Sequence, residues 1–194
     1  MRFFVSGSGT GVGKTFFSAL LAKHYYEQGA DVSYIKPVQT GYPADNDALF
    51  IQEFSGIKKA KTIFTAEPPI APCLCFEKFP IDEVISTINS DTSDVLIVEG
   101  AGGIAVPLDY ETPTWKIAKE CDLDIVVALP DRLGCVNEAI LNYSFISNIN
   151  ARFGGFALNK FFCRTESDSQ NAGIIEKILP ASISYIYNQT LEII

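Results

Sequence analysis

The chain has 194 residues, 47% hydrophobic and 20% charged, and its 15 basic and 23 acidic side chains give a formal net charge of −8. This length suits one domain over residues 1–194, with a core large enough to need no disulfide bonds. The acidic balance argues against a nucleic-acid partner, because no cluster of Lys or Arg offsets it. We expect no leader, and no apolar stretch is long enough for a membrane span. We therefore expect a cytoplasmic protein without a membrane partner.

A short apolar strand over residues 2–6 opens the chain and leads directly into a glycine-rich loop that ends in Gly13-Lys14-Thr15. A helical pattern follows over residues 14–28. This order is typical of a phosphate-binding loop, in which backbone N–H groups and the helix dipole face the phosphates. Lys14 then reaches the outer phosphates, and the Thr15 hydroxyl supplies a Mg²⁺ ligand. The sequence therefore predicts a nucleoside triphosphate site.

Apolar segments alternate with helical patterns along the rest of the chain. Strands are expected at 32–35, 94–98, 124–129, 155–158 and 183–186, and helices at 48–54, 81–88, 114–120, 136–149 and 172–179. Lys36-Pro37 is expected to end the second strand, and residues 99–103 to form a loop. Strands that are apolar at successive positions and are separated by helices predict a mostly parallel sheet with helices on both faces. Together with the phosphate-binding loop, this pattern predicts an α/β fold of the P-loop NTPase type. Ligands bind beyond the carboxyl ends of such strands.

Charged residues follow several strands at that edge of the sheet. Lys36 comes after the second strand, and Glu99 comes after the strand at 94–98. A carboxylate at the end of an apolar strand is what a P-loop enzyme needs to hold Mg²⁺, and Asp47 offers a further oxygen. Each residue also has a structural interpretation, as a solvated Lys, a turn-forming Glu or a helix-capping Asp. Their joint arrangement favours a site in which Lys36 and Lys14 face a strongly anionic ligand.

Five blocks spread over nearly the whole chain resemble the dethiobiotin synthetase family. They are Gly7-x-x-Thr10-x-Val12-Gly13-Lys14-Thr15, Lys36-Pro37-Val38-x-Thr40-Gly41, Asn46-Asp47-Ala48, Val98-Glu99-Gly100-Ala101-Gly102-Gly103 and Leu133-Gly134-Cys135-Val136-Asn137. The resemblance implies an ATP-dependent ligase of biotin biosynthesis. One amine of 7,8-diaminopelargonate (7,8-diaminononanoate) takes up CO₂ or bicarbonate, and the carbamate attacks the γ-phosphate of MgATP. The second amine then displaces phosphate and closes the ureido ring of dethiobiotin, with ADP as the other product.

The same resemblance assigns roles to individual residues. Lys36 and Lys14 are implied as catalytic, and Thr15, Asp47 and Glu99 as Mg²⁺ ligands. The implied substrate contacts are Thr10, Thr40, Leu133, Gly134, Cys135 and Asn137, the last four from the neighbouring subunit of a homodimer, where they hold the substrate's tail carboxylate. The implied ATP contacts are Gly11, Val12, Gly13, Lys14, Thr15, Phe16, Asp47, Glu99, Gly100, Ala101, Gly102, Asn159 and Lys160. Asn159 occupies the position at which the family recognises adenine.

The chain departs from the family pattern after Pro180, where a Gly-x-Ile-Pro-like segment that closes over the base has no counterpart. We therefore expect weak discrimination among bases, because fewer polar groups penalise a wrong one. The leading alternative function is a ParA- or MinD-like ATPase switch. Those proteins carry a second lysine where Gly9 stands, and this chain has no basic or amphipathic membrane-binding tail. A pure nucleotide-binding module would leave Lys36 and Thr40 unexplained.

Overall fold

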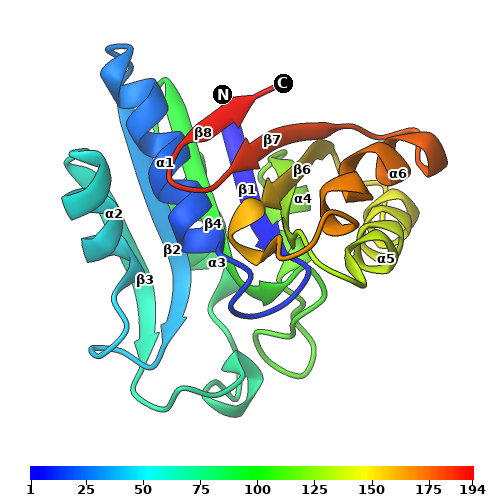
Figure 1. Cartoon of the computed structure of the whole chain (residues 1–194). Helices are drawn as coiled ribbons and strands as arrows, with labels where there is room; N and C mark the ends of the chain where they lie inside the picture. Colours follow the sequence, from blue (N-terminus) through cyan, green and yellow to red (C-terminus); the bar gives the residue numbers. More distant parts are fainter.

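Eight strands form a single sheet in the computed structural model, which describes residues 1–194 (Figure 1). The strands are β1 (Arg2–Gly7), β2 (Val32–Thr40), β3 (Lys59–Ala66), β4 (Val95–Gly103), β5 (Asp124–Pro130), β6 (Phe153–Asn159), β7 (Ile183–Tyr187) and β8 (Leu191–Ile193). Their order across the sheet is β3-β2-β4-β1-β5-β6-β7-β8, and every pair is parallel except β7 and β8. The predicted P-loop NTPase type of α/β fold with a mostly parallel sheet is confirmed.

Helices cover both faces of this sheet. They are α1 (Lys14–Glu27), α2 (Asp47–Ser55), α3 (Ile81–Asn89), α4 (Trp115–Glu120), α5 (Cys135–Asn148) and α6 (Asn171–Ile178), with 3₁₀ turns η1 (Pro72–Leu74), η2 (Lys160–Phe162) and η3 (Asp168–Gln170). One apolar cluster joins α1 and α2 to one face, and a second joins α3, α4, α5 and α6 to the other. None of the helices has the length and apolarity that crossing a bilayer requires.

Two strands extend further than the sequence predicts. The prediction that Lys36-Pro37 ends the second strand is wrong, because β2 continues through both residues. The pairing of β2 with β4 stops at Ile35, and the register of β2 with β3 passes over Pro37. The proline therefore removes no hydrogen bond from the ladder. Residues 99–103 continue β4 rather than forming a loop, and Gly103 pairs with Gly7 of β1 after a register shift.

Strands β3 and β8 are absent from the sequence prediction, because each lies at an edge of the sheet. β3 has an exposed or half-buried side chain at every position and carries Lys59 and Lys61, charges that protect an edge strand from pairing with other chains. β8 has only three residues. Neither segment therefore has the apolar run that marks the buried strands.

The central strands supply the stability of the fold. Ile97 of β4 is fully buried between β1 and β2. Ile97→Ala is expected to lower the free energy of unfolding by about 2–5 kcal/mol, because it removes apolar burial and leaves a cavity. Urea denaturation measures this change. Leu74→Ala, at an exposed position, is the control and should stay within about 0.5 kcal/mol of the parent protein; equal losses in the two variants would contradict this account.

Candidate active site

The loop between β1 and α1 carries backbone N–H groups without partners in the protein. None of the eight N–H groups of residues 9–16 donates a hydrogen bond, whereas Ser8 and Phe17 on either side donate to backbone carbonyls. Gly11 and Gly13 have φ angles of +73° and +95°, which glycine adopts without strain. Unpaired N–H groups at the start of a helix attract anions, because the helix dipole acts in the same direction. The loop therefore has the properties of a phosphate site.

Two buried side chains hold this loop from the sheet side. Asn159 Nδ2, at the end of β6, donates to Val12 O at 3.0 Å, and the Tyr187 hydroxyl, at the end of β7, donates to the same oxygen at 3.2 Å. A Cβ at Gly13 would contact both side chains, so glycine is required there for space as well as for conformation. Asn159 Nδ2 carries a second N–H, and the base contact that the resemblance implies for this side chain stays a prediction.

Glu99 is a fully buried carboxylate surrounded by four donors. Its Oε1 accepts from Thr15 Oγ1 at 2.9 Å and from Lys36 Nζ at 2.8 Å. Its Oε2 accepts from Ser18 Oγ at 2.9 Å and from the Tyr34 hydroxyl at 3.0 Å. A buried carboxylate is stable only when such donors replace its hydration. These donors fix the carboxylate at the edge of the phosphate loop.

Lys36 lies between two carboxylates. Its Nζ is 2.6 Å from Asp47 Oδ2 and 2.8 Å from Glu99 Oε1. Burial by itself lowers the pKa of Lys36, but the two carboxylates outweigh burial and raise this pKa above its ordinary value. Burial by itself raises the pKa of Glu99, but the ammonium groups of Lys36 and Lys14 outweigh it and hold this pKa below its usual value. Both members of the pair are therefore charged at neutral pH.

Of the two lysines in the site, Lys14 is the one whose positive charge is less neutralised by carboxylates. It is buried, and its Nζ donates to Gly9 O at 3.0 Å. Burial lowers the pKa of Lys14, Lys36 lowers it further, and Glu99 opposes both. A bound phosphate would supply the negative charge that this ammonium group lacks.

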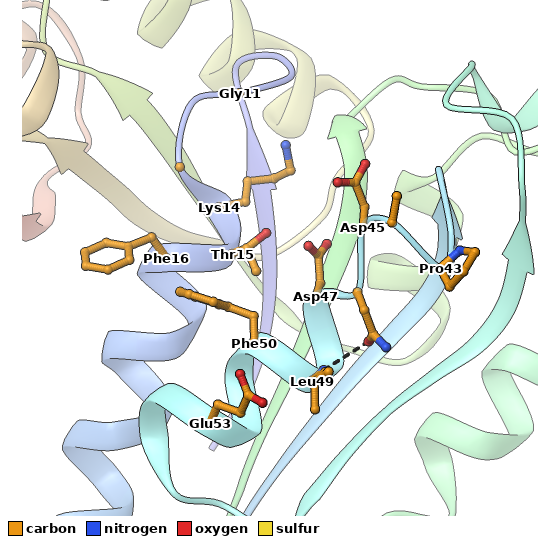
Figure 2. Close-up of a pocket in the computed structure, with 13 residues that line it drawn as sticks. Gly11, Lys14, Thr15, Phe16, Pro43, Asp45, Asp47, Leu49, Phe50 and Glu53 are labelled. Atoms are coloured by element: carbon orange, nitrogen blue, oxygen red, sulfur yellow. Dashed lines mark hydrogen bonds between the residues drawn. The ribbon is translucent and has the colours of Figure 1, made fainter.

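Two cavities meet at the phosphate loop and share Gly11, Lys14, Thr15, Asp45 and Asp47. The larger, of about 650 Å³, runs from the loop to Phe16, Leu49 and Phe50 (Figure 2). The other, of about 450 Å³, extends from the loop to Lys36, Thr40 and Glu99. The loop is therefore in a position to bind one ligand at the junction of two separate spaces.

Most of the residues singled out from the sequence line these cavities: Thr10, Gly11, Gly13, Lys14, Thr15, Phe16, Lys36, Thr40, Asp47, Glu99, Ala101 and Gly102. Val12, Gly100, Asn159 and Lys160 do not line either cavity. The Lys160 ammonium lies 2.6 Å from the buried carboxylate of Asp131 instead. The structure therefore brings together the loop, the two lysines and the three expected metal ligands.

The donor set of Thr15, Asp47 and Glu99 fits Mg²⁺. All three offer hard oxygen atoms, and Thr15 Oγ1 lies 2.9 Å from Glu99 Oε1. No group of three or more His, Cys, Asp or Glu side chains is placed to hold a metal ion. Mg²⁺ is usually held by one or two carboxylates together with substrate phosphates and water. A metal here would therefore depend on a bound nucleotide.

The segment 133–137, at the start of α5, lies outside both cavities. Leu133 is 91% exposed, whereas Cys135 is buried, and burial raises the pKa of its thiol to about 12. The backbone N–H groups of Val136 and Asn137 have no partner. Within one chain this segment therefore offers backbone donors and the Asn137 side chain, but no reactive thiol.

Three residues of the site are missing from the sequence prediction, although two of them left a signal. Ser18 follows Thr15 by about one helical turn, so the two residues lie on the same face of α1. Tyr34 precedes Lys36 by two residues, so these two lie on the same face of β2. Tyr187 has no such signal, because only the fold brings β7 next to the loop.

The fold and this site define a P-loop nucleotide-binding protein. An AAA domain family matches residues 1–183. The ATP-dependent dethiobiotin synthetases BioD of Hydrogenobaculum sp. and Leptospira interrogans are 33% and 31% identical, over 95% and 80% of this chain and 88% and 72% of their own lengths. The chain belongs to the dethiobiotin synthetase family.

Two solved structures with a similar fold carry names other than dethiobiotin synthetase. The signal recognition particle receptor FtsY from Elizabethkingia anophelis has a TM-score of 0.66 at 16% identity, over 99% of this chain and 61% of that one. The septum site-determining protein MinD from Pyrococcus horikoshii, complexed with Mg-ADP, has a TM-score of 0.58 at 14% identity, over 97% of this chain and 82% of that one. At such identities the likeness concerns the fold alone.

The hydrogen bonds to Glu99 can be tested one at a time. Tyr34→Phe removes a hydroxyl donor from a buried, charged acceptor and is expected to lower the free energy of unfolding by about 1.5–3 kcal/mol in urea denaturation. Tyr26→Phe is the matched control, because the Tyr26 side chain is exposed and makes no hydrogen bond, and it should change stability by less than about 0.5 kcal/mol. An unchanged stability of Tyr34→Phe would show that Glu99 does not depend on this donor.

Proposed function

We propose that this chain is an ATP-dependent dethiobiotin synthetase, which joins CO₂ to 7,8-diaminopelargonate and closes the ureido ring. The observation that carries the proposal is the second cavity, in which Lys14 and Thr15 of the phosphate loop face Lys36 and Thr40 of β2. A triphosphate on the loop would present its terminal phosphate to this cavity. The space beside it is where a second substrate would meet that phosphate.

The two lysines supply the positive charge that this reaction requires. The carbamate oxygen forms a bond to the γ-phosphorus, and the bond from that phosphorus to ADP breaks. Both reacting groups are anionic, so their approach requires cations between them, and Lys14 and Lys36 supply two. The second amine then attacks the carbamate carbon, and phosphate leaves as the nitrogen loses its proton. Bound Mg²⁺, held by Thr15, Asp47 and Glu99, would neutralise phosphate charge.

The second cavity also suits the rest of the diamine. Thr10 and Thr40 line it with hydroxyl groups that can bind the carbamate or an amine. Ile70, Pro72 and Val106 add apolar surface against which an aliphatic chain can pack. Catalysis then consists mainly of positioning and charge stabilisation, and a histidine base is not needed.

We further propose that the protein acts as a homodimer, in which residues 133–137 of one subunit bind the tail carboxylate of the diamine held by the other. The exposed Leu133 and the free N–H groups of Val136 and Asn137 support this proposal. N–H groups at a helix start bind carboxylates well. The segment lies outside the cavities of its own chain, which favours a role at a neighbouring site.

The ParA- or MinD-like switch is the weaker candidate. Its support is the fold likeness to MinD at 14% identity. Gly9 stands where such proteins carry a second lysine in the loop. The relatives with higher identity are named as dethiobiotin synthetases.

A phosphate-release assay tests the proposed function directly. Phosphate and dethiobiotin should form only when diaminopelargonate, bicarbonate and MgATP are all present, because the carbamate is the phosphoryl acceptor. Chelation of Mg²⁺ with EDTA should stop the reaction. If phosphate is released equally fast without the diamine, the protein is a simple ATPase and the synthetase proposal fails.

Lys36→Ala separates binding from turnover. We expect this variant to keep its Kd for MgATP within about 3-fold and to lose at least 100-fold in kcat, because Lys36 acts on the developing charge. Lys58→Ala, at an exposed position, is the control for loss of a lysine. Weakened nucleotide binding with an unaltered residual rate would make Lys36 a simple phosphate contact.

Asn137→Ala tests the proposed tail site. The KM for the diamine should rise about 10-fold, as expected for loss of one charge-assisted hydrogen bond, while the KM for ATP stays unchanged. Asn148→Ala, at the exposed last residue of α5, is the matched control. Sedimentation should show a dimer. A monomer with an unchanged KM in Asn137→Ala would contradict the shared site.

A further inference from the structure

Asp45 has a carboxylate without a partner at the junction of the two cavities. The residue is exposed and lines both cavities. Asp47, two positions further along the chain, lies 2.6 Å from Lys36 Nζ, whereas the Asp45 carboxylate has neither a cation within ion-pair distance nor a hydrogen-bond donor. The sequence analysis and the reaction scheme above leave Asp45 without a role.

The backbone holds Asp45 beside Thr40. Asp45 N donates to Gly41 O at 2.9 Å, so the chain turns back over the residue that follows Thr40. Gly41 has a φ of +79°, and a Cβ there would lie 2.7 Å from Asp45 Oδ2. The Asp45 carboxylate therefore occupies the space that a side chain at position 41 would take. Figure 2 shows it extending toward the side on which the Lys14 ammonium lies.

The fixed charges of the second cavity leave Asp45 uncompensated. This cavity is lined by the two lysines Lys14 and Lys36 and by the three carboxylates of Asp45, Asp47 and Glu99. Lys36 pairs with Asp47 and Glu99, and Lys14 would face the terminal phosphate of a triphosphate on the loop. A triphosphate and the Asp45 carboxylate repel each other unless a cation lies between them. The second cavity therefore favours a ligand that brings a positive charge to Asp45.

A second acceptor next to Thr40 also has no donor. Gln39 lines the same cavity and is 7% exposed. Its Nε2 donates to Thr40 O at 3.0 Å, but its Oε1 is buried without a hydrogen-bond partner. Buried acceptors in folded proteins are nearly always paired, so this one points to a donor supplied from the cavity side. A ligand with N–H groups carries such donors, whereas a triphosphate group has only acceptors.

We propose that Asp45 binds the amino group of the diamine that does not take up CO₂, in its ammonium form. This inference rests on the proposed function, because it assigns one group of that substrate to one residue. The two amines of 7,8-diaminopelargonate stand on adjacent carbon atoms, so a carbamate bound at Thr40 places the other amine a few ångströms away, on the side of Asp45. Ammonium and carboxylate then form a charge-assisted hydrogen bond.

This contact selects a diamine and orders the ring closure. A hydroxyl group in place of the second amine has no charge for Asp45 to attract. The bound ammonium keeps the nitrogen beside the carbamate carbon while the phosphoryl group is transferred. Because Asp45 is exposed, the ammonium can lose one proton to water, and the free electron pair of the neutral amine then attacks the carbamate carbon.

Asp45→Asn tests the proposal, because it removes the charge but keeps an acceptor oxygen. The KM for the diamine should rise at least 10-fold, while kcat, the KM for MgATP and the dependence on Mg²⁺ stay within about 3-fold of the parent protein. Glu53→Gln is the matched control, because Glu53 is an exposed carboxylate that lines only the larger cavity, and its KM for the diamine should not change. Thermal unfolding checks that both variants keep the fold.

Two monoamines, 7-aminononanoate and 8-aminononanoate, show whether Asp45 acts on one amino group. Each lacks one amine of the substrate, and each is measured as a competitive inhibitor. The monoamine that lacks the group bound by Asp45 should inhibit the parent protein and Asp45→Asn equally, whereas the other should lose at least 10-fold in affinity in the variant. Equal losses for both monoamines would make Asp45 a structural residue and overturn the proposal.

The same assays separate this inference from the proposed function. If the parent protein releases no phosphate in response to the diamine, the synthetase function fails, and the role of Asp45 fails with it. If the parent protein is active and Asp45→Asn has an unchanged KM for the diamine, the proposal for Asp45 alone is overturned. A changed dependence on Mg²⁺ with an unchanged KM for the diamine would assign Asp45 to the metal instead and would also overturn it.

Discussion

The buried pair of Glu99 and Lys36 is the interaction on which the site depends. Glu99 has no access to solvent, so its charge is stable only because α1 and β2 surround it with hydroxyl and ammonium donors. Lys36 in turn is held by Glu99 and by Asp47 at the start of α2. Three elements that are separate in sequence are therefore held at one point, beside the phosphate loop. A buried ion pair contributes little net stability, but it fixes geometry, which phosphoryl transfer needs.

The parallel sheet explains why these residues meet. In a parallel arrangement the strands end at the same edge, so the residues that follow β1, β2 and β4 along the chain are brought together. The glycines at the end of β4 serve the same purpose, because Gly103 packs against the backbone of Gly7 without a side chain between them. Side chains of different chemistry can therefore stand within hydrogen-bond distance of one anion.

Much of the fold was predictable because its signals are local. The apolar runs at β4 and β5 and the Gly13-Lys14-Thr15 sequence each predict their own local structure. The family, which is confirmed, was predicted from five short sequence motifs. The prediction failed where the deciding contact was distant. Pro37 is compatible with β2 only because the neighbouring β4 no longer pairs there. The side chains around the loop, such as Tyr187, have no neighbour in sequence that would reveal their contact.

The hydrogen bond from Tyr187 to Val12 spans 175 positions of the chain. During synthesis the phosphate loop emerges long before the strand that holds it from behind. Contacts of such high sequence separation are slow to form, because closing a long loop costs chain entropy. Nucleotide binding is therefore a property of the completed sheet. A partly folded chain would expose the loop sequence without the side chains of β6 and β7 that hold its backbone.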